Sequence, residues 1–158
     1  MAHALKFMIN KGPLAIDYGV MPLEGLWWLH DMSTFISGNK DQWPWTLMIM
    51  QPDLITAALV EEAVAIVKRK KPSALLQIRF ARYDEGRCAQ TLHKGPFSEE
   101  VPTVERVHAF IASKGCKLTR KHHEIYLSDM RRAALENWKN VIRQPMVCGS
   151  QNTQRPSQ

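Results

Sequence analysis

The run from His122 to Asp129 combines a carboxylate, a phenol and imidazoles in a segment that favours β structure. Side chains alternate across a strand, so we expect two faces: His122, Glu124, Tyr126 and Ser128 on one, and His123, Ile125 and Leu127 on the other. A carboxylate at the centre of a strand is costly unless it is paired or solvated. Glu124 must therefore face water, a partner charge or a ligand.

A second acidic and aromatic strand is predicted near Leu23–Trp28, where alternation places Glu24, Leu26 and Trp28 on one face. The chain has five tryptophans, and most of them cluster here and at Trp43 and Trp45. This clustering fits either ordinary core packing or a flat aromatic pocket. A pocket of this kind suits a planar cationic or polycyclic ligand, because each ring face attracts a cation by roughly 0.5–2 kcal/mol and a carboxylate supplies the counter-charge.

Other kinds of site are less well supported by the residue pattern. Neighbouring side chains on a strand point to opposite faces, so His122 and His123 cannot easily share a metal ion, and no metal-ligand spacing is present. We therefore expect no metal and no cofactor. The cysteines at 88, 116 and 148 form no paired framework and are interpreted as reduced thiols, with Cys88 a buried inert one. Phe97 follows a Gly-Pro turn, so it is either an ordinary residue of that turn or a wall of the pocket.

Composition bounds the class of protein. The 158 residues suit one compact domain, with 45% hydrophobic and 23% charged residues. The apolar stretch Leu54–Val67 is interrupted by two glutamates, and the N-terminus lacks a secretory pattern, so we expect a cytoplasmic protein without a membrane span. The net charge is +6, and the basic run Lys68–Lys71 is interpreted as a helix end that complements the helix dipole rather than a nucleic-acid site.

The order of predicted elements favours an α+β domain with an antiparallel sheet. The predicted helices are the end of one at Ala2–Ile9, a short one at Gln42–Met50, one from Pro52 to the residue before Pro72, and one from Pro102 to Gly115. The predicted strands are Ile16–Met21, Leu23–His30, Leu75–Tyr83, Arg87–His93, His122–Ser128 and Val141–Pro145. Ser33–Asp41 is predicted as a loop, Asp129–Glu136 as a short polar segment, and Gly149–Gln158 as a disordered tail.

With these segments assembled, the chain resembles the GyrI-like small-molecule-binding family, and within it the stand-alone bacterial branch. The matching segments are MPLEGLWW (21–28), WPWTLMIMQPD (43–53), EGRCAQTLHKGPFSEE (85–100), HHEIYLSD (122–129) and VIRQPM (141–146). The resemblance implies one domain over residues 1–148, with a first unit at 1–52, a connecting helix at 53–72 and a second unit at 73–148. It further implies two strand-helix-strand-strand units related by a pseudo-two-fold axis, with helices on one side of the sheet and a ligand cleft between the units on the other.

The resemblance also implies a function, with two alternatives. One is a sensor or sink that binds cationic and aromatic drugs or toxins, with no direct role in binding nucleic acid. The other is a hydrolase that opens the strained cyclopropane ring of DNA-alkylating natural products, with Glu124 and Tyr126 as its catalytic residues. The candidate ligand-binding residues carried over by motif position are Glu24, Trp27, Trp28, Trp45, Phe97, Glu124 and Tyr126.

The same resemblance places Met1 inside the first helix of the family's fold. We therefore expect the opening strand of the first unit to be missing, which leaves a sheet edge open. A second chain could supply that strand by strand addition. A homodimer through the exposed edge, a well-folded monomer and a gene-boundary artefact remain alternatives at this stage.

Overall fold

The computed structural model describes residues 1–29, 43–68 and 77–149. The predicted loop Ser33–Asp41, the basic residues 69–71 and the predicted tail from residue 150 onward lie outside the described residues. Two compact units are present: residues 1–23 with 49–84, and residues 24–48 with 85–158. The prediction that residues 1–148 form a single domain stays a prediction.

Where the structure describes the first unit, it contains a pair of helices, α1 (Ala2–Lys11) and α2 (Ala57–Lys68). Helix α1 ends where the backbone N–H of Gly12 donates to the carbonyl of Met8, and Pro13 cannot continue the helix. At the start of α2, the backbone N–H of Leu59 donates to Thr56 Oγ1 at 3.4 Å. The apolar faces of the helices meet in a small core made of Leu5, Ile9, Ile55, Val60 and Ala63.

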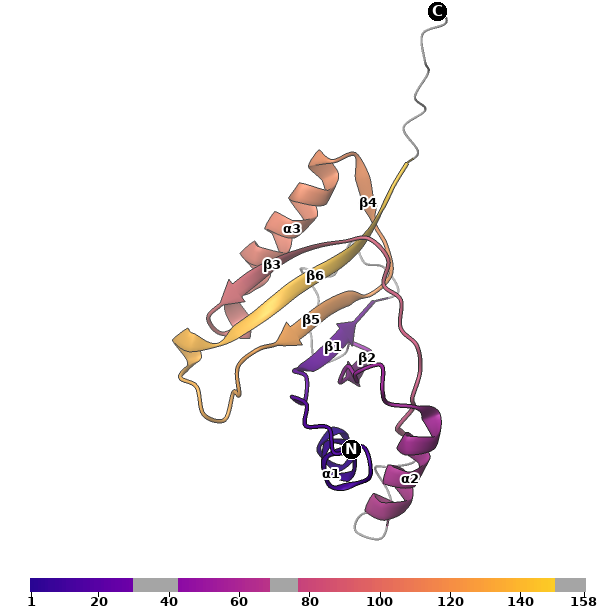
Figure 1. Cartoon of the computed structure of the whole chain (residues 1–158). Coiled ribbons are helices and arrows are strands. Elements are labelled where there is room, and N and C mark those ends of the chain that lie inside the picture. The colour runs from indigo at the N-terminus through magenta and orange to yellow at the C-terminus, as the bar shows by residue number, and fades with distance from the viewer. Residues whose placement is uncertain (30–42, 69–76, 150–158) are drawn as a thin grey trace, which may run out of the picture. The chain divides into compact units, whose positions relative to one another are not determined.

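The described residues of the second unit form a six-stranded sheet with one α-helix. Its strands are β1 (Leu23–Trp27), β2 (Trp45–Met48), β3 (Cys88–Lys94), β4 (Cys116–Leu118), β5 (His122–Tyr126) and β6 (Lys139–Cys148). The order across the sheet is β2-β1-β5-β6-β3, and β4 pairs with the far end of β6. Figure 1 shows the long strand β6 between β3 and β5. The predicted α+β class with an antiparallel sheet is confirmed.

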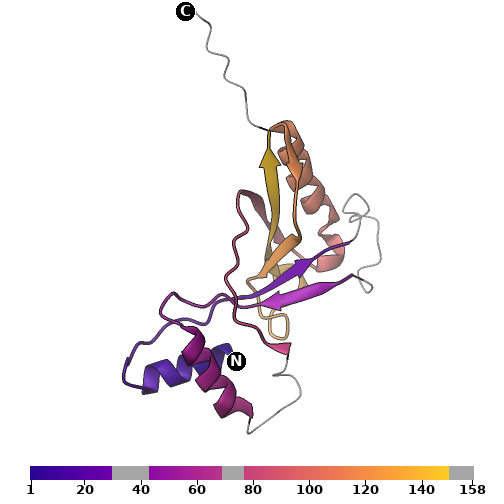
Figure 2. The ribbon, with the colours of Figure 1, turned by 90° about the vertical axis from the view of Figure 1, so that its right-hand side faces the viewer.

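Helix α3 (Val101–Ser113) covers one face of this sheet and contacts β3, β4 and β6 (Figure 2). Pro102 lies in its first turn, a position where the missing N–H costs nothing. Its buried residues Val104, Val107 and Ile111 recur at helical spacing, as predicted, and pack on Ile142 of β6. This face of the sheet therefore holds the core, and Asn140 and Gln144, which share it with Ile142, are buried.

Several predicted elements differ from the structure. Residues 45–48 form β2 instead of part of a helix, because pairing with β1 in the register Trp27↔Trp45 outweighs the local apolar run. Residues 16–21 and 77–83 are not strands, since none of their described residues pairs with a neighbouring strand. Strand β4 was not predicted. Strand β2 lies at one edge of the described sheet. Strand addition by a second chain, one of the alternatives left open by the sequence, stays a prediction.

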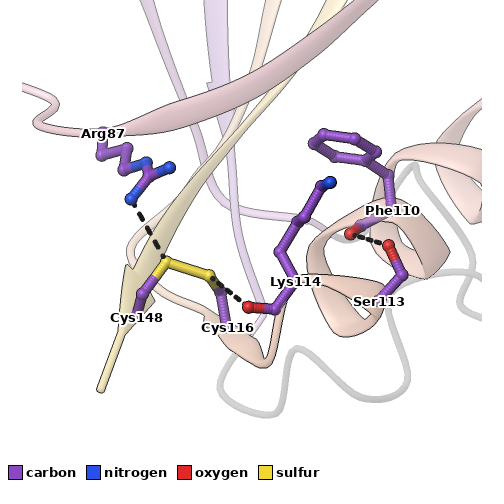
Figure 3. The surroundings of a disulfide bond; sticks show 6 residues. All are labelled: Arg87, Phe110, Ser113, Lys114, Cys116 and Cys148. Atoms are coloured by element: carbon purple, nitrogen blue, oxygen red, sulfur yellow. Dashed lines mark hydrogen bonds between the residues drawn. A yellow bond between two sulfur atoms is a disulfide. The ribbon is translucent and has the colours of Figure 1, made fainter. Parts of the chain in front are cut away.

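Two cysteines predicted to be reduced form a disulfide, which corrects that interpretation. Cys116 of β4 and Cys148 of β6 are directly opposite each other in the antiparallel pair. Figure 3 shows the bond beside Arg87, whose guanidinium donates to Cys148 Sγ at 3.7 Å. The sequence could not show this pairing, because the cysteines are 32 residues apart and only the sheet brings them together. Cys88 is free.

The described part of the chain contains no helix that is both long enough and apolar enough to cross a lipid bilayer.

Candidate functional site

The second unit contains a cavity of about 280 Å³, small for a ligand site. Four aromatic rings, two carboxylates and a thioether surround it: Trp27, Trp43, Phe97, Tyr126, Glu100, Glu124 and Met130. The residues come from β1, β5, the segment before β2, the 3-10 turn η4 (Phe97–Glu99), the residue between η4 and α3, and the turn after β5. The cavity therefore depends on segments that are far apart in the sequence.

Strand β5 places Glu124 and Tyr126 at the cavity. Glu124 is opposite Ile142 of β6, and Tyr126 is opposite Asn140. Opposite residues in an antiparallel pair share a face, so both side chains lie on the core face that α3 covers. Glu124 is only 5% exposed. The predicted alternation in this strand matches the structure, but the cavity lies on the helix-covered face of this sheet and not on the opposite one.

Tyr126 is held from two sides. The indole N–H of Trp27 donates to its hydroxyl oxygen at 3.0 Å, and the Phe97 ring approaches edge-on with a centroid distance of 5.6 Å. Burial raises the pKa of Tyr126, and the neighbouring charge of Glu124 raises it further. The phenol is therefore neutral at physiological pH, and its O–H can donate a hydrogen bond to a carboxylate.

Glu100 is a functional candidate that the sequence analysis missed. It precedes α3 directly and is only 2% exposed. Asn140 Nδ2 donates to its Oε2 at 3.5 Å. A negative charge is favourable at a helix N-terminus, and an acid immediately before a Val-Pro helix start is the one signal in the sequence that could have indicated it. Together with Glu124, this residue gives the cavity two carboxylates.

Two other lining residues were not among the predicted site residues. Trp43, 5% exposed, belongs to the core beneath α3 as well as to the cavity wall. Met130 follows β5 after a turn and has no signal of its own in the sequence. Phe97 was predicted as a pocket wall and does line the cavity, where it also contacts the Trp138 ring at a centroid distance of 5.1 Å.

Glu24, in contrast, does not line the cavity. Its Oε2 lies 2.8 Å from Nε2 of His123, a residue on the opposite face of β5 from Glu124. The other imidazole nitrogen, Nδ1, lies 2.8 Å from Oε1 of Glu85, and Arg143 Nη1 donates to Glu85 Oε2 at 3.3 Å. Glu24 and Glu124 were predicted to face each other across one cleft, but the structure does not bring these two side chains together.

The ion cluster of Glu24, His123, Glu85 and Arg143 favours the protonated form of the imidazole. Both ring nitrogens face carboxylate oxygens, which only accept hydrogen bonds when ionised, so both nitrogens must donate. Burial by itself would lower the pKa of His123, but hydrogen bonds to Glu24 and Glu85 raise it overall. The cluster therefore has a structural role, and it gives the Glu24 carboxylate a partner outside the cavity.

The remaining predicted residues also lie outside the cavity lining. Lys121 Nζ stands 3.3 Å from the centroid of the Trp28 ring, so a cation of this chain already occupies one face of that indole. Trp45 is on strand β2 and is 57% exposed. Of the predicted site residues, Trp27, Phe97, Glu124 and Tyr126 are therefore the ones that the structure brings together.

The chemistry available at the cavity follows from this composition. Aromatic walls stack on flat rings, and an ionised carboxyl group among them favours a cation over an anion. No group of three or more His, Cys, Asp or Glu side chains in the described residues could hold a metal ion. Cys88 lies outside the cavity lining, and burial together with the charge of Glu85 raises its pKa to about 11, which leaves the thiol unreactive.

Comparison with known families and structures adds to this geometry. The family model described as GyrI-like small molecule binding domain matches residues 6–143. A crystal structure of an uncharacterized conserved protein from Listeria innocua is similar, with 38% identity and a TM-score of 0.80; the match covers 92% of this chain and 74% of that chain. A crystal structure described as a hydrolase from the same organism has 37% identity and a TM-score of 0.77, with the same coverage. Among curated proteins, no match was found.

Proposed function

This chain belongs to the GyrI-like small-molecule-binding domain family, and from that premise we propose that it binds planar aromatic cations as a drug or toxin sensor or sink. The observation that carries the proposal is the pair of buried carboxylates, Glu100 and Glu124, among aromatic rings in one cavity. A flat ring gains contact area against the aromatic walls. Its positive charge gains further from ring faces and carboxylates, and each cation–π contact contributes roughly 0.5–2 kcal/mol.

The small cavity volume limits the ligand. At about 280 Å³, the space suits one ring system rather than a large macrocycle. Glu124 is the central acid, because Tyr126 and Trp27 form one wall beside it. Ethidium is an aromatic cation, and phenanthridine is its uncharged ring system without the phenyl, ethyl and amino substituents, so the charge argument is tested by how each probe responds to Glu124→Gln.

Isothermal titration calorimetry with these probes tests the proposal. We expect ethidium to bind the wild-type protein more tightly than phenanthridine does. Glu124→Gln keeps the shape but removes the charge, so ethidium affinity should fall by about tenfold, while phenanthridine affinity changes little. Glu105→Gln is the matched control, since Glu105 is an exposed acid on α3. An unchanged ethidium affinity in Glu124→Gln would remove the charge argument.

A hydrolase is the second candidate, favoured by the crystal structure from Listeria innocua described as a hydrolase. The proposed reaction adds water across a strained cyclopropane ring of a DNA-alkylating natural product. A C–O bond forms to water while a ring C–C bond breaks, and the fragment that keeps the electron pair takes up a proton. Glu124 would accept the proton of the attacking water, and Tyr126 would hold the carboxylate.

This reaction predicts a hydrated, ring-opened product. Mass spectrometry after incubation with a cyclopropane-containing alkylator should detect the addition of one water molecule above the uncatalysed background. Glu124→Gln should abolish the excess, because an amide cannot accept the proton. Glu105→Gln should retain it. Product formation at the background rate with the wild-type protein would leave binding as the function.

A further inference from the structure

Gly25 stands in the middle of β1, where glycine is a poor choice by local preference. Glycine weakens strand interiors, and in strands it often marks the close approach of another group. The backbone at Gly25 is not in the left-handed region that favours glycine. The reason for glycine at this position must therefore be space rather than backbone conformation.

The space beside Gly25 is filled by two side chains of the cavity wall. A Cβ atom at this position would lie 2.7 Å from Trp27 Nε1 and 2.8 Å from the Tyr126 hydroxyl oxygen. Contacts this short do not occur for real Cβ atoms, so one or both polar atoms would have to move. These atoms are the two ends of the 3.0 Å hydrogen bond between Trp27 and Tyr126. Indole and phenol rings are rigid, so moving either atom swings a whole ring.

We propose that Gly25 is a positioning residue of the ligand site: its missing side chain leaves the space in which Trp27 binds Tyr126, and this bond aims the Tyr126 proton at Glu124. The role rests on the proposed function at the same cavity. The hydrogen-bond chain would run from the Trp27 N–H to the Tyr126 oxygen, and from the Tyr126 O–H to the Glu124 carboxylate.

Donor and acceptor chemistry sets the direction of this chain. An indole N–H only donates, so the Tyr126 oxygen is the acceptor of the bond with Trp27. The single proton of Tyr126 is then left for Glu124, which lies two residues earlier on the same face of β5 and lines the same cavity. Tyr126 thus orients the carboxylate, and Glu124 is the group that contacts the ligand. A methyl group at position 25 would break the first link and loosen the second.

Nuclear magnetic resonance of ¹⁵N-tryptophan-labelled protein tests the first link without any ligand. The Trp27 indole N–H signal is assigned by its loss in Trp27→Phe. We expect Tyr126→Phe to shift this signal upfield, because its acceptor is gone, and Gly25→Ala to shift it in the same direction. Gly19→Ala is the matched control, since a Cβ at Gly19 has no heavy atom within 4 Å. An unchanged Trp27 signal in Gly25→Ala would overturn the inference.

Ethidium affinity tests the second link. Gly25→Ala should weaken ethidium binding by roughly fivefold, as for the loss of one hydrogen bond, and should have little further effect in a Tyr126→Phe background. Equal effects in both backgrounds would contradict a role through Tyr126. If ethidium does not bind the wild-type protein, the proposed function fails, whereas the resonance experiment still decides the role of Gly25.

A further variant covers the case in which Gly25→Ala does not fold. The double variant Trp27→Phe/Tyr126→Phe removes both polar atoms that a Cβ atom at position 25 would meet. Adding Gly25→Ala to this double variant should therefore leave its urea midpoint nearly unchanged. A triple variant that fails to fold where the double variant folds would show that something other than the indole nitrogen and the phenol oxygen excludes a side chain at position 25, and would overturn the inference.

Discussion

Tyr126 is neutral at physiological pH, and this determines what the aromatic wall of the cavity can do. Burial and the charge of Glu124 raise its pKa, and the hydrogen bond from Trp27 offsets only part of that increase. A neutral phenol cannot act as a base, but it can donate a hydrogen bond to a carboxylate. In both proposed functions, Glu124 is therefore the residue that meets the ligand, and Tyr126 keeps it in place.

At single residues, strand alternation predicted which side chains share one face of a strand. Alternation correctly grouped Glu124 with Tyr126, because β5 is regular and pairs with β6 along its length. Alternation also places Glu24 and Trp27, which are three residues apart, on opposite faces of β1. What the sequence could not show is which face of β1 meets the Glu124 face of β5, since a one-residue change of register exchanges the faces. The acid that shares the cavity is Glu100, which approaches from a helix start.

At the scale of elements, the ion cluster joins β1, β5, β6 and the segment before β3. His123 of β5 lies between Glu24 of β1 and Glu85, and Glu85 in turn binds Arg143 of β6. Burying such charges is costly, and removing one partner from a buried cluster costs about 3–5 kcal/mol because it leaves an uncompensated buried charge. The cluster therefore favours this strand arrangement over alternatives that would leave one of its charges unpaired.

The cluster predicts a pH dependence of stability. The folded-state pKa of His123 is raised, so its contribution is fully present below the unfolded pKa of about 6.5 and is lost as pH rises through the folded pKa. The pKa of Glu85 is lowered: burial opposes the shift, but His123 and Arg143 outweigh it. Its contribution is present above its unfolded pKa and is lost as pH falls through the folded pKa. Urea midpoints of the wild-type protein should thus decline above neutral pH.

The variant His123→Gln isolates this contribution. It should unfold at a lower urea concentration at pH 6 and show a flatter profile toward alkaline pH than the wild-type protein. His3→Gln, at an exposed position, should reproduce the wild-type profile. An alkaline decline that persists undiminished in His123→Gln would assign the effect to another group.

At the scale of the whole molecule, the class of fold was predictable and the long-range pairings were not. The order of helices and strands was sufficient for an α+β class, since α3, β3, β5 and β6 carry strong local patterns. The region 45–48 was predicted as helix because its apolar run has no decisive period, and only its pairing with β1 makes it a strand. The sheet order and the Cys116–Cys148 bond likewise depend on residues far apart in the chain.

The disulfide allows a last prediction. It closes a loop of 32 residues that contains β5 and most of β6, so it restricts the unfolded chain and should stabilise the fold by roughly 3–4 kcal/mol. Thiol titration of the denatured, unreduced protein should detect only Cys88, and reduction should expose Cys116 and Cys148 as well. The reduced protein should unfold at a lower urea concentration, and Cys148→Ser should match it. Cys88→Ser should keep the response to reductant, because its thiol takes no part in the bond. Full thiol reactivity before reduction would mean that the bond does not form in solution and that β4 is held to β6 by backbone pairing and the α3 core alone.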